Sequence, residues 1–199
     1  MTGIFSLVSK AIPLLEFLLI IVLFFLVLMA LFFYVSLFYS EILGAPFVSL
    51  RKKYLKEILK FGGLKEEDVL FDFGSGDGRV LITAVENFGI KKAVGFEASP
   101  CVYWLSKFFI KIRGLNSKIK IFPQNFLKIE KEEFEEATFV FLYLFPKPVE
   151  KLFKSQLFQL KPGTKILCVS FSPKLENHYY RLLKSEKVGW HTIYLYQKI

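Results

Sequence analysis

The sequence predicts an α/β domain whose mostly parallel sheet ends in an antiparallel hairpin, preceded by one transmembrane helix. Two observations support this prediction. Residues 14–39 form an almost unbroken apolar run, and from residue 69 onward short apolar strands alternate with helices of ordinary length. We therefore divide the 199 residues into an N-terminal segment, 1–43, and a single domain, 44–199.

The apolar run is long enough for a membrane helix. At 1.5 Å per residue it spans about 39 Å, against a hydrocarbon core of roughly 30 Å. Tyr34 and Tyr39 lie where an interfacial aromatic belt is expected. A secretory signal peptide has a shorter apolar core, of about 7–15 residues, followed by a small-residue cleavage site. We therefore favour a retained anchor over a signal peptide.

Flanking charges predict how this anchor is oriented. Before the run there is one lysine, Lys10, whereas five basic residues follow it: Arg51, Lys52, Lys53, Lys56 and Lys60. The positive-inside bias places the domain on the cytoplasmic side of a membrane. The formal net charge is +9, but attraction of this cluster to anionic lipid accounts for its densest part. No basic stretch is interleaved with aromatic residues, so nucleic acid is not favoured as a partner.

The order of elements after the run can be read from turns and apolar periodicity. Gly44-Ala45-Pro46 is expected to end the membrane helix, and Ser49 to cap an amphipathic helix that stops at Gly62-Gly63. The expected strands are 69–73, 93–96, 118–122, 138–144 and 165–171, and the expected helices are 78–88, 99–112 and 148–160. The acidic stretch 130–136 is interpreted as a solvated helical turn, and 179–185 with 191–196 as a hairpin.

A glycine-rich turn follows the first strand, where a parallel sheet binds its ligand. It reads Asp72-Phe73-Gly74-Ser75-Gly76-Asp77-Gly78-Arg79. A dinucleotide fingerprint needs its third glycine at position 79, which is Arg here. Carboxylates beside the turn repel a pyrophosphate but attract a cation. The turn therefore favours a positively charged ligand with an amino-acid end, such as S-adenosylmethionine.

Two further polar positions follow the next strands. Glu97 ends the second strand, where its carboxylate can accept hydrogen bonds from both ribose hydroxyls of a nucleoside. Gln124-Asn125 follows the third strand, where an amide can bond the adenine edge. The alternative is a tight turn with an exposed strand end, but the ordered series of strand, acid, glycines, helix and second acid favours cofactor binding.

Residues 69–80 resemble motif I of class I methyltransferases, and residues 93–99 resemble the segment that holds their ribose-binding acid. More narrowly, the chain resembles the membrane-anchored protein lysine methyltransferases of mitochondria and their prokaryotic relatives. This resemblance covers nearly the whole chain: the N-terminal span, Gly44-Ala45-Pro46-Phe47-Val48, the glycine turn with Val80, Gly95-Phe96-Glu97, Leu160-Lys161-Pro162-Gly163 and Phe171-Ser172-Pro173.

The resemblance implies a Rossmann-like class I methyltransferase fold and S-adenosylmethionine as the cofactor. The cofactor-binding residues that it implies are Asp72, Gly74, Ser75, Gly76, Asp77, Gly78, Glu97 and Asn125. Relatives often have Asp at the last of these positions, and either residue can contact adenine. The implied reaction is methylation of a lysine on a protein at or near the membrane.

Aromatic residues at the ends of the fourth and fifth strands are candidates for the methyl-acceptor channel: Tyr143, Phe145 and Phe171. Aromatic faces can hold an approaching lysine ammonium, although packing at the sheet rim is an equal alternative. No general base is assigned. Alternative functions are methylation of a lipid or quinone, methylation of nucleic acid, and a non-catalytic membrane scaffold. Leu144-Phe145-Pro146-Lys147 lacks the amide or acid with which enzymes that methylate base amines hold that amine.

No metal site is expected. The two cysteines, Cys101 and Cys168, fall in a helix start and in a strand, and His178 and His191 have no ligand spacing. We interpret the cysteines as reduced thiols and the histidines as strand residues.

Overall fold

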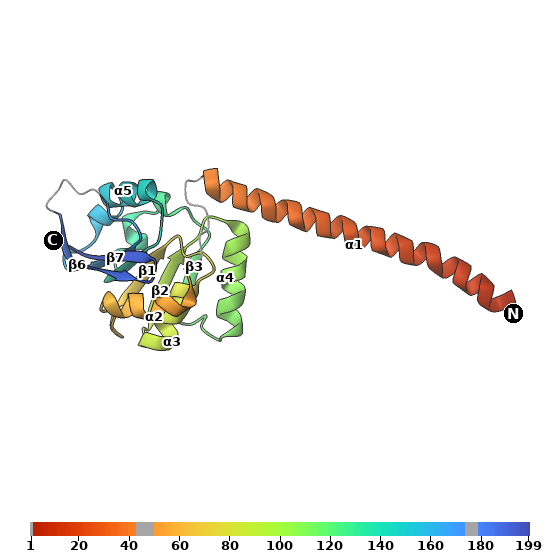
Figure 1. Cartoon of the computed structure of the whole chain (residues 1–199), viewed down its shortest axis with the longest axis horizontal. Coiled ribbons are helices and arrows are strands. Elements are labelled where there is room, and N and C mark those ends of the chain that lie inside the picture. Colours follow the sequence, from red (N-terminus) through yellow and green to blue (C-terminus); the bar gives the residue numbers. More distant parts are fainter. Residues whose placement is uncertain (1, 43–49, 174–178) are drawn as a thin grey trace.

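The domain is a seven-stranded sheet with helices on both faces, and one long helix projects from it (Figure 1). This computed structural model describes residues 2–42, 50–173 and 179–199. The strand order is β3-β2-β1-β4-β5-β7-β6, with parallel pairing from β3 to β5 and antiparallel pairing of β7 to both of its neighbours. The Rossmann-like prediction, with its antiparallel C-terminal hairpin, is confirmed.

The helices are α1 (Thr2–Ile42), α2 (Lys52–Phe61), α3 (Arg79–Phe88), α4 (Pro100–Ile112) and α5 (Pro146–Lys154). The strands are β1 (Val69–Phe73), β2 (Lys92–Phe96), β3 (Ile119–Phe122), β4 (Phe139–Leu142), β5 (Lys165–Val169), β6 (Tyr180–Val188) and β7 (His191–Lys198). Single turns of 3₁₀ helix lie at Phe126–Lys128, Lys131–Glu133 and Leu157–Gln159.

Most expected elements lie where the sequence places them, and the largest error concerns the helix expected at 148–160. It begins earlier, because Pro146 and Pro148 both lie in its first turn, where a missing amide hydrogen costs nothing. It ends at Lys154, because Ser155 leaves helical geometry with φ −125° and ψ −92°. A 3₁₀ turn then completes the connection to β5.

The long helix α1 is continuous through Pro13 and includes the expected span at 14–39. Its segment Leu15–Val35 has a mean hydropathy of 3.2 and is not buried in the domain, so by length and composition it is able to cross a membrane. The turn expected at Gly44-Ala45-Pro46, the cap at Ser49 and the residue His178 lie outside the described residues.

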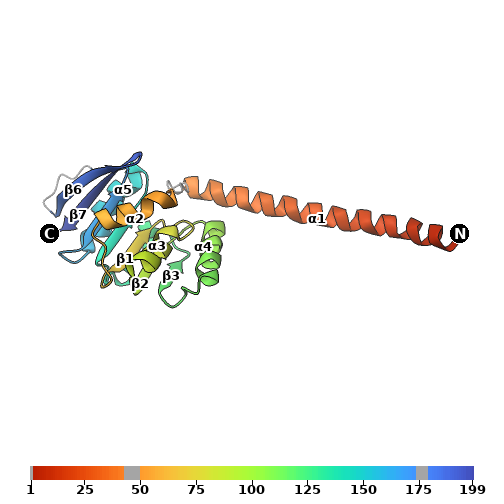
Figure 2. The same cartoon turned by 60° about the horizontal axis from the view of Figure 1, so that its bottom comes forward.

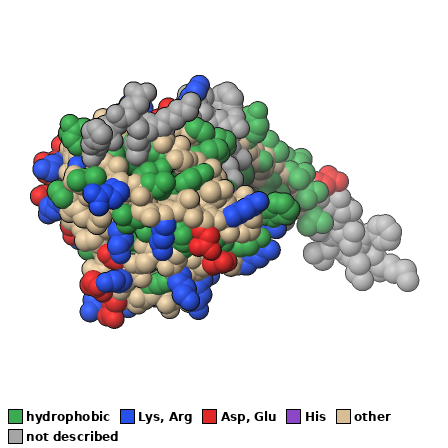
Figure 3. Space-filling view, turned by 60° about the vertical axis from the view of Figure 1, so that its left-hand side comes forward, with side chains coloured by type: hydrophobic (Ala, Val, Ile, Leu, Met, Phe, Trp, Pro, Cys, Tyr) green, Lys and Arg blue, Asp and Glu red, His purple; other side chains and the backbone are tan. Residues whose placement is uncertain are grey.

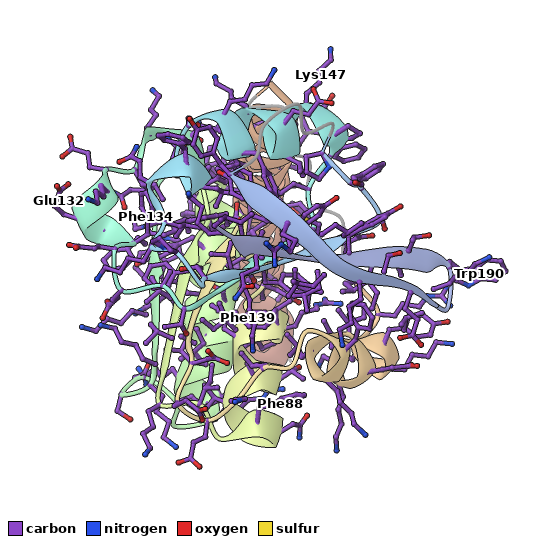
Figure 4. The ribbon with its side chains drawn as sticks, turned by 90° about the vertical axis from the view of Figure 1, so that its left-hand side faces the viewer. Phe88, Glu132, Phe134, Phe139, Lys147 and Trp190 are labelled. Carbon is purple, nitrogen blue, oxygen red and sulfur yellow. The ribbon has the colours of Figure 1, made fainter. Side chains whose placement is uncertain are left out.

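Two apolar layers cover the sheet. One lies beneath α2 and α3 and includes Leu55, Leu81 and Phe139, while the other lies beneath α5 and includes Phe73 and Phe153. The acidic stretch 130–136 anchors to the second layer, because Phe134 points inward and is fully buried whereas Glu132 points to solvent (Figure 4). The sequence analysis therefore predicted the helical turn and its solvated acids correctly. It did not predict that Phe134 is buried beside them.

Charged side chains are scattered over the face of the domain that Figure 3 shows. On the face shown in Figure 3, Lys and Arg alternate with Asp and Glu and do not gather into one basic patch. The excess positive charge therefore gives this face no continuous track of the kind that binds a nucleic-acid backbone.

Candidate active site

The turn between β1 and α3 is held open by three glycines in the left-handed region. Gly74, Gly76 and Gly78 have φ values of 86°, 55° and 77°. Any side chain at these positions would strain the backbone. The expected pattern of alternating glycines therefore reflects a real backbone requirement, and it leaves the main chain of the turn bare where it passes the carboxyl ends of β1 and β2.

Hydrogen bonds tie this turn to the end of β2. The amides of Gly74 and Ser75 both donate to the carbonyl of Phe96, at 2.9 and 3.0 Å. The Glu97 carboxylate accepts from the Gly76 amide at 2.9 Å and from the Ser99 amide at 2.7 Å. One side chain therefore joins the glycine turn to the start of α4.

The Glu97 carboxylate retains capacity for a ligand. It is 8% exposed, and burial raises its pKa, although the hydrogen bonds from the Ser99 and Gly76 amides and, to a smaller extent, the nearby Ala98 amide oppose that rise. An ionised carboxylate offers about four lone-pair sites, and two of them are used by the Gly76 and Ser99 amides. The remaining sites suit the two ribose hydroxyls that the sequence analysis assigned to this residue.

Asp72 is the most perturbed group of the site. Its side chain lies at the end of β1 and the residue is only 2% exposed. Burial, together with the negative charges of Glu97 and Asp77, raises the pKa of Asp72 well above the usual range. Among the described residues none donates a hydrogen bond to its carboxylate. An unpaired buried carboxylate is costly unless a cation or a donor compensates it.

Asp77 has a different environment from Asp72. Arg79 binds it through two guanidinium nitrogens, Nε at 2.7 Å and Nη2, and also donates from Nη1 to the carbonyl of Leu50 at 2.8 Å. The charge of Asp77 is therefore largely compensated within the protein. The Asp77–Arg79 pair links the glycine turn to the segment just before α2, a role that the sequence analysis did not assign.

Ser75 contributes through packing rather than through its hydroxyl. Its amide bonds Phe96, and its Oγ is buried with no hydrogen-bond partner among the described residues. It lies directly against Gly95 of β2, where an added Cβ would come within 2.6 Å of both Ser75 Cβ and Ser75 Oγ. Gly95 is therefore required for the turn to sit on the sheet, and the sequence analysis did not place it in the site.

Asn125 lies at the carboxyl end of β3, as expected. Its Oδ1 accepts from the Leu127 amide at 2.9 Å and caps the short helix Phe126–Lys128. This bond leaves the NH₂ group, which can donate to a ring nitrogen of an adenine. The Asn125 side chain can thus offer a base a donor, whereas an ionised carboxylate at this position could only accept.

The three candidate acceptor residues separate into two groups. Phe145 and Phe171 stack with ring centroids 6.0 Å apart. Tyr143 instead lies against His191, whose ring also contacts Tyr54, at centroid distances of 5.5 and 6.2 Å. The three candidates for the acceptor channel thus make two separate sets of ring contacts at the carboxyl ends of β4 and β5.

His191 and Ser170 complete the Tyr143 group. Ser170 Oγ lies 2.7 Å from His191 Nδ1, and Ser170 has a φ of 70°, the one positive value among the described non-glycine residues. Such strain at a bonded Ser–His pair often marks a functional site. Burial lowers the pKa of His191, which keeps its ring neutral at neutral pH. Neither residue stands out in the sequence, because β5–β7 pairing across more than twenty positions brings them together.

Leu144, between the two aromatic groups, packs onto the glycine turn. An added Cβ at Gly74 would lie 2.7 Å from Leu144 Cδ2. The position where base-amine methyltransferases place an amide or acid is thus apolar and buried here. Within the described part of the chain no three His, Cys, Asp or Glu side chains gather as metal ligands do.

The fold and the acid–glycine turn define a class I methyltransferase. Residues 72–176 match the family model of the ANTKMT methyltransferase domain, and the chain belongs to that family. Accordingly its methyl donor is S-adenosylmethionine, and the bare glycine turn, the unpartnered Asp72 carboxylate and the open lone pairs of Glu97 fit a cationic nucleoside of this kind.

Two curated relatives bear names that describe activity on lysine. The chain is 30% identical over 158 residues to a protein-lysine N-methyltransferase of Saccharolobus islandicus, covering 79% of this chain and 96% of that protein. It is 27% identical over 126 residues to a Rattus norvegicus protein named as a lysine N-methyltransferase of an ATP synthase subunit. That match covers 63% of this chain and 56% of the rat protein, so the chain spans about half the length of this mammalian relative.

Solved structures of similar fold include an RNA methyltransferase from Salinibacter ruber in complex with S-adenosyl-L-homocysteine. It has a TM-score of 0.68 and 27% identity and covers 76% of this chain and 94% of that one. TrmN from Thermus thermophilus, at 15% identity, has a TM-score of 0.64 and covers 76% of this chain and 50% of that one.

Replacing Asp72 by Asn tests the cost of the buried carboxylate. The raised pKa means that the folded state holds this proton to a higher pH than the unfolded state does. Protonated Asp72 therefore contributes its full stability below the usual aspartate pKa. This stability is lost as the pH rises through the pKa of Asp72 in the folded protein. At neutral pH the substitution should stabilise the free protein, and a gain of about 1 kcal/mol raises Tm by roughly 2–4 °C at this size.

The same variant should bind S-adenosylmethionine more weakly. Affinity of the native protein should rise with pH through the Asp72 pKa, because the ionised form attracts the cation, and the variant should lose this dependence. Thermal melts and calorimetry from mildly acidic to mildly alkaline buffer measure both effects. Equal cofactor affinity in the two proteins would contradict the role of Asp72.

Replacing Gly95 by Ala tests the contact between the turn and the sheet. The new Cβ would lie 2.6 Å from Ser75 Cβ and 2.8 Å from Leu81 Cδ1, so we expect a loss of about 1–3 kcal/mol in the free energy of unfolding. Adding Ser75→Gly to this variant removes the nearer contact and should recover part of the loss. Chemical denaturation of the single and double variants measures both, and an undisturbed Gly95→Ala protein would refute the close approach.

Proposed function

We propose that this protein is a membrane-anchored protein-lysine N-methyltransferase that acts on a protein at or near the membrane. The observation that supports the choice of lysine is the likeness to the protein-lysine N-methyltransferase of Saccharolobus islandicus, at 30% identity over 96% of that protein. Residues 1–43 form the anchoring segment in this proposal, and residues 44–199 form the catalytic domain on the cytoplasmic side. The apolar span Leu15–Val35 and the basic residues after it support this arrangement.

The proposed cofactor site consists of the eight residues assigned from the sequence. Asp72 faces the positive charge of the cofactor, Glu97 accepts from the ribose and Asn125 donates to the adenine. Gly74, Gly76 and Gly78 give the backbone its close approach, while Ser75 and Asp77 hold the turn in place. When bound, the cofactor supplies an electrophilic methyl group on its sulfonium.

The remaining task of the protein is to present a neutral lysine amine. Lysine has a pKa of about 10.4, so removing its proton at pH 7 costs roughly 4–5 kcal/mol. A desolvating channel lowers this pKa, while aromatic faces attract the ammonium as it approaches. The Tyr143–His191–Tyr54 group and the Phe145–Phe171 stack are the proposed walls, and burial already raises the pKa of the Tyr143 phenol, as a desolvating site requires.

A nucleic-acid substrate is the second candidate, because the RNA methyltransferase from Salinibacter ruber is similar over most of this chain. Two observations favour a protein substrate. Position 144 is a leucine packed on the glycine turn, and Lys and Arg alternate with acids on the surface seen in Figure 3. Methylation of a lipid or quinone at the membrane is the third candidate, and the same experiment separates all three.

The substrate class is tested with the full chain reconstituted in lipid vesicles. We expect methyl label from S-adenosylmethionine to enter lysine side chains when a membrane-protein extract is supplied. A Glu97→Ala variant, which lacks the proposed ribose acceptor, serves as the control and should transfer no label. Label in extracted lipid or RNA, and none in protein, would overturn the choice of substrate and leave the cofactor site standing.

A Tyr143→Ala variant tests the aromatic wall. If its ring holds the lysine through a cation–π contact of about 1–2 kcal/mol, kcat/KM should fall roughly 5–30-fold while cofactor affinity stays unchanged. Phe158 provides a matched control, because it packs on Tyr179 with ring centroids 4.8 Å apart, outside both aromatic groups. Phe158→Ala should keep full activity, and an equal loss in both variants would assign Tyr143 to general packing.

A further inference from the structure

Helix α4 has an apolar face that the domain leaves uncovered. Its inner face is buried through Val102, Ser106 and Ile110. The opposite side carries an exposed stripe, defined by Trp104 at 65% exposure, Leu105 at 41%, Phe108 at 57% and Ile112 at 59%. Single exposed apolar residues are normal, but a contiguous stripe of four large ones on one helix usually marks an interaction surface.

The position of α4 indicates what covers this stripe. Helix α4 contacts α1, and it lies at the β3 edge of the sheet, on the side of the domain from which α1 projects. In Figures 1 and 2 α4 runs crosswise to α1, so a plane perpendicular to the anchor lies along α4. A bilayer crossed by α1 has that orientation.

The height of α4 also fits a bilayer surface. The apolar run ends at residue 39 and α1 continues to Ile42, which adds about 5 Å of helix at 1.5 Å per residue. The headgroup layer on each side of a bilayer is about 5–8 Å thick, from a total of about 40–45 Å around a core of 30 Å. The end of α1, and with it α4, therefore lies at the headgroup level.

The charges on α4 suit anionic lipid. The helix contains no acidic residue, and Lys107 and Lys111, one helical turn apart, border the stripe on one side. Neither lysine takes part in an ion pair with another described residue. Trp, Phe and Leu on one face with Lys along its border is the composition of helices that lie in the membrane interface.

We propose that α4 is a second membrane contact, seated with its exposed stripe in the headgroup region of the bilayer that α1 crosses. This inference depends on the anchor in the proposed function. Because the amide of Ser99, at the start of α4, donates to Glu97, seating α4 fixes the height of the glycine turn above the lipid. The catalytic edge is then held at a constant distance from the membrane, within reach of lysines near its surface.

The chain contains two tryptophans, which provide a matched pair for the test. Trp104 is on the stripe, whereas Trp190 is 83% exposed at the β6–β7 turn, near the opposite edge of the sheet (Figure 4). Five strand spacings separate β3 from β7, or about 24 Å. The full chain is reconstituted as Trp190→Phe, which keeps only Trp104, and as Trp104→Phe, which keeps only Trp190.

Vesicles of phosphatidylcholine with phosphatidylserine are prepared with and without phosphatidylcholine brominated in its acyl chains. We expect brominated lipid to quench most of the Trp104 emission, whose maximum should lie at shorter wavelength than that of Trp190, and to leave Trp190 nearly unchanged. Flotation of both variants with the vesicles measures α1 anchoring separately, and calorimetry with S-adenosylmethionine confirms that each domain is folded.

Three results would overturn the proposal. Vesicle-bound protein with unquenched, solvent-exposed Trp104 would leave the stripe away from lipid. Equal quenching of Trp104 and Trp190 would mean that the domain has no fixed orientation relative to the bilayer. A shielded Trp104 that is insensitive to brominated lipid, in protein that cross-links as a dimer, would assign the stripe to a second copy of the chain. Protein that fails to float would instead overturn the anchor, and with it this inference, while leaving the cofactor site standing.

Discussion

The bonds of Glu97 fix the geometry on which the rest of the site depends. The Glu97 carboxylate accepts from Gly76 in the glycine turn and from Ser99 at the start of α4, and it joins the segment that follows β1 to the segment that follows β2. Because both donors are backbone amides, the arrangement does not depend on flexible side chains. Glycines with positive φ at 74, 76 and 78 let the turn come close enough for these bonds, and Gly95 lets it rest on β2. The backbone conformation of these glycines and the Glu97 carboxylate thus preorganise the cofactor site in the free protein.

The clustered carboxylates of this site destabilise the free protein electrostatically. Burial and the negative charges of Glu97 and Asp77 raise the pKa of Asp72, and of these three acids only Asp77 has a cationic partner among the described residues, Arg79. Asp72 is only 2% exposed, so its carboxylate is poorly solvated, and no described cation pairs with it. A cationic ligand removes this penalty, so part of its binding free energy comes from relief of a cost already present in the fold. A neutral or anionic nucleoside gains nothing comparable, which gives the site a physical basis for preferring a sulfonium.

The sequence was sufficient to predict those features that depend on residues close together in the chain. Strand order along the chain, the glycine turn, its flanking acids and the long apolar helix all follow from local patterns, and the structure has the predicted α/β fold. Features that depend on distant pairing could not be foreseen. His191 meets Ser170 because β7 pairs antiparallel with β5, and Tyr143 then faces His191 rather than Phe145 and Phe171. The early end of α5 at Lys154 likewise reflects the backbone conformation of Ser155, a residue type that is not a strong helix breaker.

Two contacts connect the cofactor turn to the side of the domain that faces α1. Arg79 bonds the carbonyl of Leu50, the first described residue after the segment that follows α1, and Glu97 bonds the start of α4. Arg79 and Glu97 both contact the glycine turn. A displacement of Leu50 or of the start of α4 would therefore shift the backbone of that turn. A bidentate guanidinium fixes direction as well as distance, which a lysine at position 79 could not do. The Gly-Asp-Gly-Arg ending of the turn is therefore explained by its contacts. Gly78 precedes the first residue of α3, Asp77 orients Arg79, and Arg79 fixes the turn relative to Leu50, which lies between α1 and α2 in the chain.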